Sequence, residues 1–338
     1  MNPLPIIDPV WLDKVPGIAL GVVTPSTLQT HVVGRRSIEP QPEPLTEDTL
    51  FDLASLTKVI FTTTVILQLI EEGRLTLETP IQSILADYVH PQTTIADLLT
   101  HQSGLPADDP LYRRCADAQA LRTFVLTHPL TYSPNHQVVY TDFGFLILGW
   151  VIERLDGPLD EVLHRRINDR LGLTDLCFLP QDPMRCAPTE NSAQRGLIRG
   201  VVHDGKANKM GGVAGNAGCF STLHDVCRFA QSFLDGQHRL LSEGSLAVLR
   251  QTQTLGLDHV RTYGWYRHDP SCAFGQHMSP DCLFHTGFSG TSIAIDFERQ
   301  LAVVILTNRI HPSRDNPHIQ ALRHHLHDAV LTWFDENL

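Results

Sequence analysis

Apolar residues gather in two short runs near the start of the chain and in three more near its end. The first two, "GIALGVV" at 17–23 and "LQTHVVG" at 28–34, are separated by a proline-containing turn, as in a β-hairpin. The last three are "CLFHTGF", "TSIAIDF" and "LAVVILTN", between 282 and 308. They are rich in β-branched residues, which favour strands. The pattern predicts strands at both ends of the chain.

Between these strand regions, apolar residues recur at helical spacing. The repeat runs from Leu53 to about Ile84 and occurs again in "TIADLLTH", "ALRTFVLTH" and "DFGFLILGWVIERL", with glycine or proline between the segments. A last amphipathic helix is predicted from about Pro317 to Phe334. Strands at both ends with helices between them indicate an α/β (α+β) fold, in which both termini build one sheet around a helical insertion.

Composition narrows the functional classes. The chain has 338 residues, of which 42% are hydrophobic and 19% charged, so it can bury a large core. Its net charge of -11 is spread along the sequence, which predicts neither a nucleic-acid partner nor a membrane partner. The N-terminus lacks a signal-peptide pattern and the longest apolar run, at 145–152, is too short to span a bilayer, so we expect a cytoplasmic location. The seven cysteines contain no C-x-x-C pair and are expected to be reduced.

One short stretch, "FDLASLTKVIF", suggests nucleophilic chemistry. In a helix, Ser55 and Lys58 lie one turn apart on the same face. A serine hydroxyl becomes a good nucleophile when a base takes its proton, and a lysine with a lowered pKa can be that base. An isolated S-x-x-K is usually accidental, but an unpaired lysine inside an apolar run would be costly. The pattern therefore predicts a functional pair.

Two later stretches strengthen this prediction. "VVYTDFGFL" contains Tyr140 and Asp142, and "FHTGFSGTS" contains His285, Thr286 and Gly287. With S-L-T-K, the series Y-T-D and H-T-G resembles the S-x-x-K, Y-x-N and K-T-G motifs of the serine β-lactamase and penicillin-binding-protein superfamily. The resemblance is to the class C β-lactamase-like branch, which includes DD-peptidases and family VIII carboxylesterases. Through "LLTHQSGLP", "GGVAGNAGCFST" and "LTNRIHPSR" it covers nearly the whole chain.

The resemblance implies a β-lactamase/transpeptidase-like fold in a single catalytic domain, residues 1–338. An antiparallel sheet flanked by helices would comprise residues 1–50 and 205–338, an all-helical subdomain would comprise 51–204, and the active site would lie between them.

The resemblance also implies catalytic roles. Ser55 would attack a carbonyl and form an acyl-enzyme, while Lys58 and Tyr140 would move the proton. The backbone N–H groups of Ser55 and Phe288 would bind the oxyanion.

The other motif residues are expected to bind substrate. His285 and Thr286 would line a strand edge along which substrate lies, and Gly287 would leave room for it. Asp142 stands where the family has asparagine. Near Lys58 it would raise the lysine pKa and make Tyr140 the better first base, or it would only cap the following helix; the sequence leaves both interpretations open.

His285 stands where the family usually has lysine, although some DD-peptidases also use histidine. A histidine is mostly neutral at pH 7 and charges near its ordinary pKa of about 6.5, so the demand for an anionic substrate is weakened.

The resulting expectation is a serine hydrolase that needs no cofactor and no metal. Its partner would be a small-molecule substrate, most simply a small carboxylic ester, with weak or no β-lactamase activity. One alternative is an amidase or DD-peptidase that acts on muropeptide fragments. Another, from a different class, is a penicillin-binding or ligand-sensing protein with negligible turnover. The sequence predicts no oligomeric state.

Overall fold

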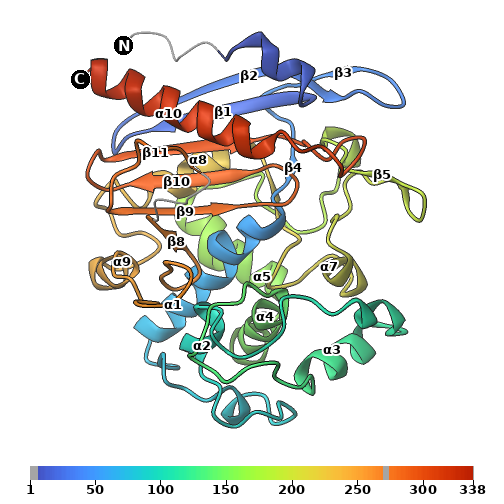
Figure 1. Cartoon of the computed structure of the whole chain (residues 1–338), viewed down its shortest axis with the longest axis vertical. Helices are drawn as coiled ribbons and strands as arrows, with labels where there is room; N and C mark the ends of the chain where they lie inside the picture. Colours follow the sequence, from blue (N-terminus) through green and yellow to red (C-terminus); the bar gives the residue numbers. More distant parts are fainter. Residues whose placement is uncertain (1–6, 269–273, 338) are drawn as a thin grey trace.

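The computed structural model describes residues 7–268 and 274–337 of the chain. Its centre is a seven-stranded antiparallel sheet in the order β3-β2-β1-β11-β10-β9-β8 (Figure 1). The strands of this sheet are β1 (Gly17–Val23), β2 (Leu28–Ser37), β3 (Glu43–Pro44), β8 (Tyr266–Arg267), β9 (Cys282–Thr286), β10 (Ser292–Asp296) and β11 (Leu301–Leu306). Because β1 pairs with β11, from Ala19 opposite Leu306 to Val23 opposite Ala302, strands from the two ends of the chain lie side by side. This confirms the predicted sheet.

Strand β1 explains how the sheet is covered on both faces. All seven of its residues are buried, and side chains alternate between the two faces of a strand. Ala19 and Val23 belong to the larger core beneath α8 (Leu223–Gln231). Ile18 and Leu20 belong to a second core beneath α10 (Ile319–Asn337), which crosses the opposite face (Figure 1).

The remaining helices lie mainly in the middle of the chain, where the sequence predicts them (Figure 1). They are α1 (Thr64–Glu71), α2 (Ile95–Leu99), α3 (Ala118–Leu126), α4 (Asp142–Asp156), α5 (Leu159–Leu163), α6 (Asp169–Leu171), α7 (Gly205–Lys209) and α9 (Glu243–Leu249). Two small sheets pair β4 (Phe51–Asp52) with β7 (Phe220–Ser221), and β5 (Asn191–Ser192) with β6 (Gly196–Leu197). Subdomain boundaries after residues 50 and 204 stay a prediction.

The helix expected from Leu53 to about Ile84 is shorter in the structure. A 3-10 helix, a π-helix (Lys58–Thr63) and α1 follow one another, and α1 ends at Glu71. Gly73 then adopts a left-handed φ of 69°, a conformation that glycine adopts readily and that ends helices. The expectation that helix continues to Ile84 is therefore wrong.

The segment Ala54–Glu71 is long and apolar enough, by composition, to cross a membrane. In the structure 83% of it is buried inside the protein, where it is the central helical segment of the larger core.

Candidate active site

Ser55 lies on a tight turn between β4 and the π-helix. The preceding residue, Ala54, has a φ of 48°, in the left-handed region that costs a non-glycine residue about 1–2 kcal/mol. The buried carboxylate of Asp52 compensates by accepting a hydrogen bond from the Ala54 N–H at 2.8 Å. Its other oxygen accepts from the His203 N–H at 2.7 Å. This pairing fixes the turn that presents Ser55.

The ammonium group of Lys58 is fully buried and has three acceptors. Its Nζ lies 2.9 Å from Ser55 Oγ, 2.7 Å from Asp142 Oδ1 and 2.9 Å from the carbonyl oxygen of Asn216. Three acceptors match the three N–H bonds of a protonated lysine. Burial alone would lower the Lys58 pKa, but Asp142, together with Tyr140, outweighs burial and the pKa is raised. Lys58 is therefore an ammonium ion in the resting site.

Asp142 does not cap the helix that it begins. The cap of α4 is Thr141, whose Oγ1 accepts a hydrogen bond from the Phe143 N–H at 3.1 Å, so the capping interpretation is wrong. The carboxylate of Asp142 instead joins two lysines, with Oδ1 on Lys58 and Oδ2 3.1 Å from Lys206 Nζ. Burial would raise its pKa, but the two ammonium groups together lower it.

Tyr140 lies against the same lysine. Lys58 Nζ is 5.1 Å from the centre of the Tyr140 ring, the ring of His101 packs against it at 4.6 Å, and Arg261 lies 5.4 Å from its centre. Burial raises the pKa of Tyr140, and the nearby ammonium of Lys58 opposes this only in part. Asp142 raises the Lys58 pKa, as expected from the sequence. Because the Tyr140 pKa is raised as well, the choice of Tyr140 as first base stays a prediction.

His285 is buried on β9, with 1% of its surface exposed. Its Nδ1 lies 3.0 Å from the Thr286 carbonyl oxygen, which can only accept, so Nδ1 carries the hydrogen. Nε2 has no partner among the described residues. Burial, with the charges of Arg261 and Lys58, lowers the His285 pKa well below 6.5. The expectation that this ring charges near pH 6.5 is therefore wrong.

Gly287 is required by a contact different from the predicted one. A Cβ at this position would lie 2.5 Å from the Leu53 carbonyl oxygen and 2.1 Å from Thr291 Oγ1. The space beside Gly287 is thus taken up by the turn that precedes Ser55 rather than by substrate. Thr291 Oγ1 donates to the Leu53 carbonyl at 3.0 Å, which ties the β9–β10 turn to the Ser55 turn.

A second hydrogen bond between the two turns holds the Phe288 N–H, the predicted oxyanion donor, near Ser55. Ser289 Oγ donates to the Asp52 carbonyl at 2.6 Å, one residue beyond Phe288. The Phe288 N–H has no acceptor in the described part of the chain. Ser55 and Phe288 line the same two cavities.

These two cavities meet at Ser55 and Tyr140. One has a volume of about 650 Å³ and is lined by both acidic and basic side chains, including Asp108, Glu190 and Lys206. The other has a volume of about 250 Å³ and contains the β9 residues His285, Thr286 and Gly287. The predicted site residues are therefore brought together around one serine.

The smaller cavity carries positive charge. Arg323 of α10 donates from Nη2 to the carbonyls of Gly287 and Thr291, at 2.9 and 2.8 Å, and Arg309 donates from Nε to the Phe288 carbonyl at 3.1 Å. Within residues 7–268 and 274–337, neither guanidinium forms an ion pair with a carboxylate. Burial, with the charge of Arg309, lowers the pKa of Arg323 to about 9, which leaves it charged at neutral pH.

Sequence reasoning missed five residues of this site. They are Lys206, His101, Arg261, Arg309 and Arg323. For Lys206, the small number of lysines could have drawn attention to it. The chain has four lysines, and two of them, Lys58 and Lys206, contact Asp142.

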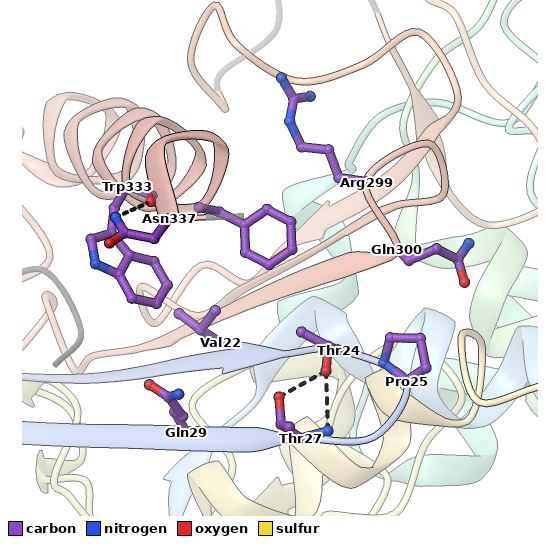
Figure 2. A pocket seen from close by; sticks show the side chains of 10 residues that line it. Val22, Thr24, Pro25, Thr27, Gln29, Arg299, Gln300, Trp333 and Asn337 are labelled. Carbon is purple, nitrogen blue, oxygen red and sulfur yellow. Dashed lines mark hydrogen bonds between the residues drawn. The ribbon is translucent and has the colours of Figure 1, made fainter. Parts of the chain in front are cut away.

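A further cavity of about 650 Å³ lies apart from these residues (Figure 2). It is lined by Trp333 and Phe334 of α10 and by the β1–β2 turn, including Thr24 and Pro25. None of the predicted site residues lines it.

Known proteins with similar sequences and structures identify the family to which this fold belongs. A family model described as "Beta-lactamase" matches residues 8–327. A protein of Escherichia coli O157:H7 with the provisional name D-alanyl-D-alanine carboxypeptidase is 32% identical over 320 residues, covering 82% of this chain and 73% of that protein.

Two solved structures are similar in fold at lower identity. EstCE1, described as a hydrolase with promiscuous acyltransferase activity, superposes with a TM-score of 0.77 at 21% identity, over 95% of this chain and 96% of that one. A class C β-lactamase from Rhodobacter sphaeroides superposes with a TM-score of 0.73 at 22% identity, over 96% of each chain.

Proposed function

Because the chain belongs to the beta-lactamase family, we propose that it is a serine hydrolase that forms an acyl-enzyme on Ser55. The observation that carries this proposal is the 2.9 Å contact between Lys58 Nζ and Ser55 Oγ, at the point where two cavities meet. A buried lysine beside a serine provides a proton acceptor once it is neutral. A protein that binds its ligand without forming a covalent bond to it would not need that arrangement.

Acylation begins when Ser55 Oγ attacks the substrate carbonyl and its proton passes to the Lys58–Tyr140 pair. The N–H groups of Ser55 and Phe288 stabilise the negative oxygen that forms. The pair then protonates the leaving group, and water releases the acyl group by the reverse sequence.

The resting pair carries one proton too many for this step. Lys58 is an ammonium ion, and burial keeps Tyr140 neutral as well. The reactive enzyme is therefore the form in which the pair has lost one proton, and the two groups titrate together rather than separately. Reactivity should rise with pH through the neutral range.

For substrate, we favour acyl compounds that carry a carboxylate near the scissile bond. Arg309 and Arg323 supply two positive charges in the smaller cavity, next to Ser55, without a carboxylate partner in the described residues. A carboxylate held there would form charge-assisted hydrogen bonds. The provisional name of the E. coli relative, D-alanyl-D-alanine carboxypeptidase, supports the same substrate class.

Small neutral carboxylic esters are the second candidate. His285 is neutral and offers only an acceptor at Nε2, so this position does not itself demand an anion. Phe288 is 47% exposed and lines both cavities, which suits an apolar acyl or alcohol group.

The test compares three substrates and one variant. A peptide ending in D-Ala-D-Ala, a p-nitrophenyl ester and nitrocefin are assayed with wild type and Ser55→Ala. We expect Ser55→Ala to lose about 10³-fold or more of kcat/KM, and a fluorophosphonate probe to add its mass to Ser55 in wild type alone. Equal labelling of the two proteins would overturn the assignment of the nucleophile.

A further inference from the structure

We propose that Lys206 is a positioning residue for the reaction at Ser55, because it shares the carboxylate of Asp142 and thereby makes Lys58 readier to take the serine proton. The inference rests on the proposed function, since it concerns the same nucleophile. Lys206 belongs to none of the three motifs that identify the site.

The geometry is a row of three charges. Asp142 Oδ1 lies 2.7 Å from Lys58 Nζ, and Asp142 Oδ2 lies 3.1 Å from Lys206 Nζ, so each lysine holds one carboxylate oxygen. Lys206 comes from α7 and Lys58 from the π-helix, while Asp142 begins α4. Three separate elements are required to build the row.

Lys206 is itself held firmly. It is 5% exposed, and its Nζ lies 3.2 Å from Asp108 Oδ1, 3.9 Å from Asp204 Oδ2 and 4.8 Å from the centre of the Tyr112 ring. Burial would lower its pKa, but Asp142, Asp204 and Asp108 outweigh burial and raise it. Lys206 therefore stays charged throughout the working range of pH.

Among the residues that the structure describes, Asp142 is the one anionic group in contact with Lys58. Tyr140 is neutral, because burial raises its pKa. His101 and His285 are neutral, because burial lowers theirs. Arg261 lies beyond Tyr140, 5.4 Å from the ring centre.

Lys206 acts on Lys58 in two ways that have the same sign. Its positive charge repels the ammonium form of Lys58, and its hold on Oδ2 reduces the negative charge that Asp142 presents to Lys58. Both favour the neutral, proton-accepting form. Without Lys206, the full charge of Asp142 would act on Lys58. The ammonium form of Lys58 would then be more stable, and Ser55 would have a weaker base.

The test measures the rate at which a fluorophosphonate modifies Ser55 between pH 6 and 10. Ser55 Oγ attacks phosphorus, fluoride leaves, and the serine proton passes to the Lys58–Tyr140 pair, so the rate reports the base and needs no knowledge of the natural substrate. Lys206→Met and Lys206→Gln remove the charge. Lys209→Met, on the same helix, is the matched control, since Lys209 makes no ion pair with Asp142.

We expect both Lys206 variants to shift the pH–rate curve upward by about one unit, and to slow labelling at pH 7 by about tenfold. Lys209→Met should follow the wild-type curve. The shift should shrink when Asp142→Asn is already present, because the shared carboxylate is gone. Melting temperatures identify any variant that is unfolded. If one of Lys206→Met and Lys206→Gln is unfolded, the pH–rate curve of the other tests the proposal.

Two outcomes count against the proposals and can be told apart. If wild type is not labelled at Ser55, the proposed function fails and this inference fails with it. If wild type is labelled and the folded Lys206 variants follow the same curve, the proposed function stands and the role of Lys206 is overturned.

Discussion

At the scale of single residues, the site is defined by Asp142, which stands at the asparagine position of the Y-x-N motif. An asparagine beside Lys58 would accept a hydrogen bond without adding charge. Asp142 instead makes an ion pair with the buried ammonium group of Lys58 at 2.7 Å and raises the lysine pKa. Because Tyr140 has a raised pKa too, the enzyme is in its least reactive protonation state at low pH.

The first prediction concerns Asp142→Asn. Removing the carboxylate takes away the main influence that raises the Lys58 pKa, so the ammonium form loses stability. We expect the rising limb of the kcat/KM profile to move to lower pH by about 1–2 units. The profile with a p-nitrophenyl ester between pH 5 and 10 measures this shift. Asp160→Asn, an exposed acidic residue in the first turn of α5, is the control and should leave the profile in place.

At the scale of secondary-structure elements, the β9–β10 turn and the Ser55 turn work as one unit. Gly287 allows their approach, and Thr291 Oγ1 bonds across it to the Leu53 carbonyl. Because the Phe288 N–H follows Gly287 directly, any movement of this turn moves the proposed oxyanion donor.

The second prediction is that Gly287→Ala separates the two turns. Its Cβ would lie 2.5 Å from a backbone oxygen, which cannot rotate away. We expect kcat to fall by about 10²-fold or more, as when one oxyanion donor is removed, and unfolding free energy to fall by about 1–3 kcal/mol. Steady-state kinetics and urea unfolding measure the two effects. Gly244→Ala is the same change in α9, where the nearest atom is 3.7 Å away, and should not lower stability.

Glu43 gives a third prediction, on stability. It joins β3 to Arg36 of β2 and to Arg199, at 2.8 and 2.7 Å. The hydrogen bond from Arg199 is the main cause that lowers the Glu43 pKa to about 2. A lowered pKa in the folded protein stabilises it above the ordinary carboxyl pKa of 4.5, and this contribution is lost as the pH falls toward 2.

Glu43→Gln should therefore reduce the free energy of unfolding by about 1–3 kcal/mol at pH 7, and by much less near pH 2. Urea titrations at several pH values test this, with Glu47→Gln as the control because Glu47 is exposed. A loss of stability that is the same at every pH would contradict the ion-pair explanation.

The features that could be predicted from the sequence are those with a local signal in the chain. The paired strands β1, β2, β9, β10 and β11 were predictable because β-branched runs and turns are local signals. Ser55 and Lys58 were predictable because one helical turn joins them. The helix end at Glu71 was missed, because a single glycine with left-handed φ stopped an apolar repeat that otherwise continued. Lys206 was missed because its contact with Asp142 spans many residues and has no local spacing.

At the scale of the whole molecule, the sheet brings the end of the chain to the nucleophile. Pairing of β1 with β11 fixes the C-terminal segment across the sheet, and α10 then lies over one face of that sheet (Figure 1). Arg323 of α10 donates to the carbonyls of Gly287 and Thr291 in the β9–β10 turn. Arg309, just after β11, donates to the Phe288 carbonyl of the same turn. The two charges of the smaller cavity thus come from the C-terminal part of the chain, while Ser55 comes from the first quarter.

The last prediction uses this arrangement to test substrate charge. Arg309 lies over the Phe288 ring, 4.7 Å from its centre, and donates hydrogen bonds only to carbonyl oxygens. Its Nη2 has no hydrogen-bond partner among the described residues, so it is the guanidinium best able to meet a substrate carboxylate. Arg309→Gln should raise KM for a D-Ala-D-Ala peptide by about five- to thirty-fold, as expected for one charge-assisted hydrogen bond, and leave KM for a neutral p-nitrophenyl ester within about twofold.

Arg314→Gln is the matched comparison. Arg314 lies over the same Phe288 ring, but its charge is paired with Glu190 at 3.1 Å, so the substitution should change the two KM values alike. The peptide-to-ester ratio should also be the same at pH 6 and pH 8 in wild type, because burial lowers the His285 pKa well below 6.5 and the ring stays neutral. If Arg309→Gln and Arg314→Gln give equal ratios, the smaller cavity does not bind an anion, and neutral esters become the preferred substrate class.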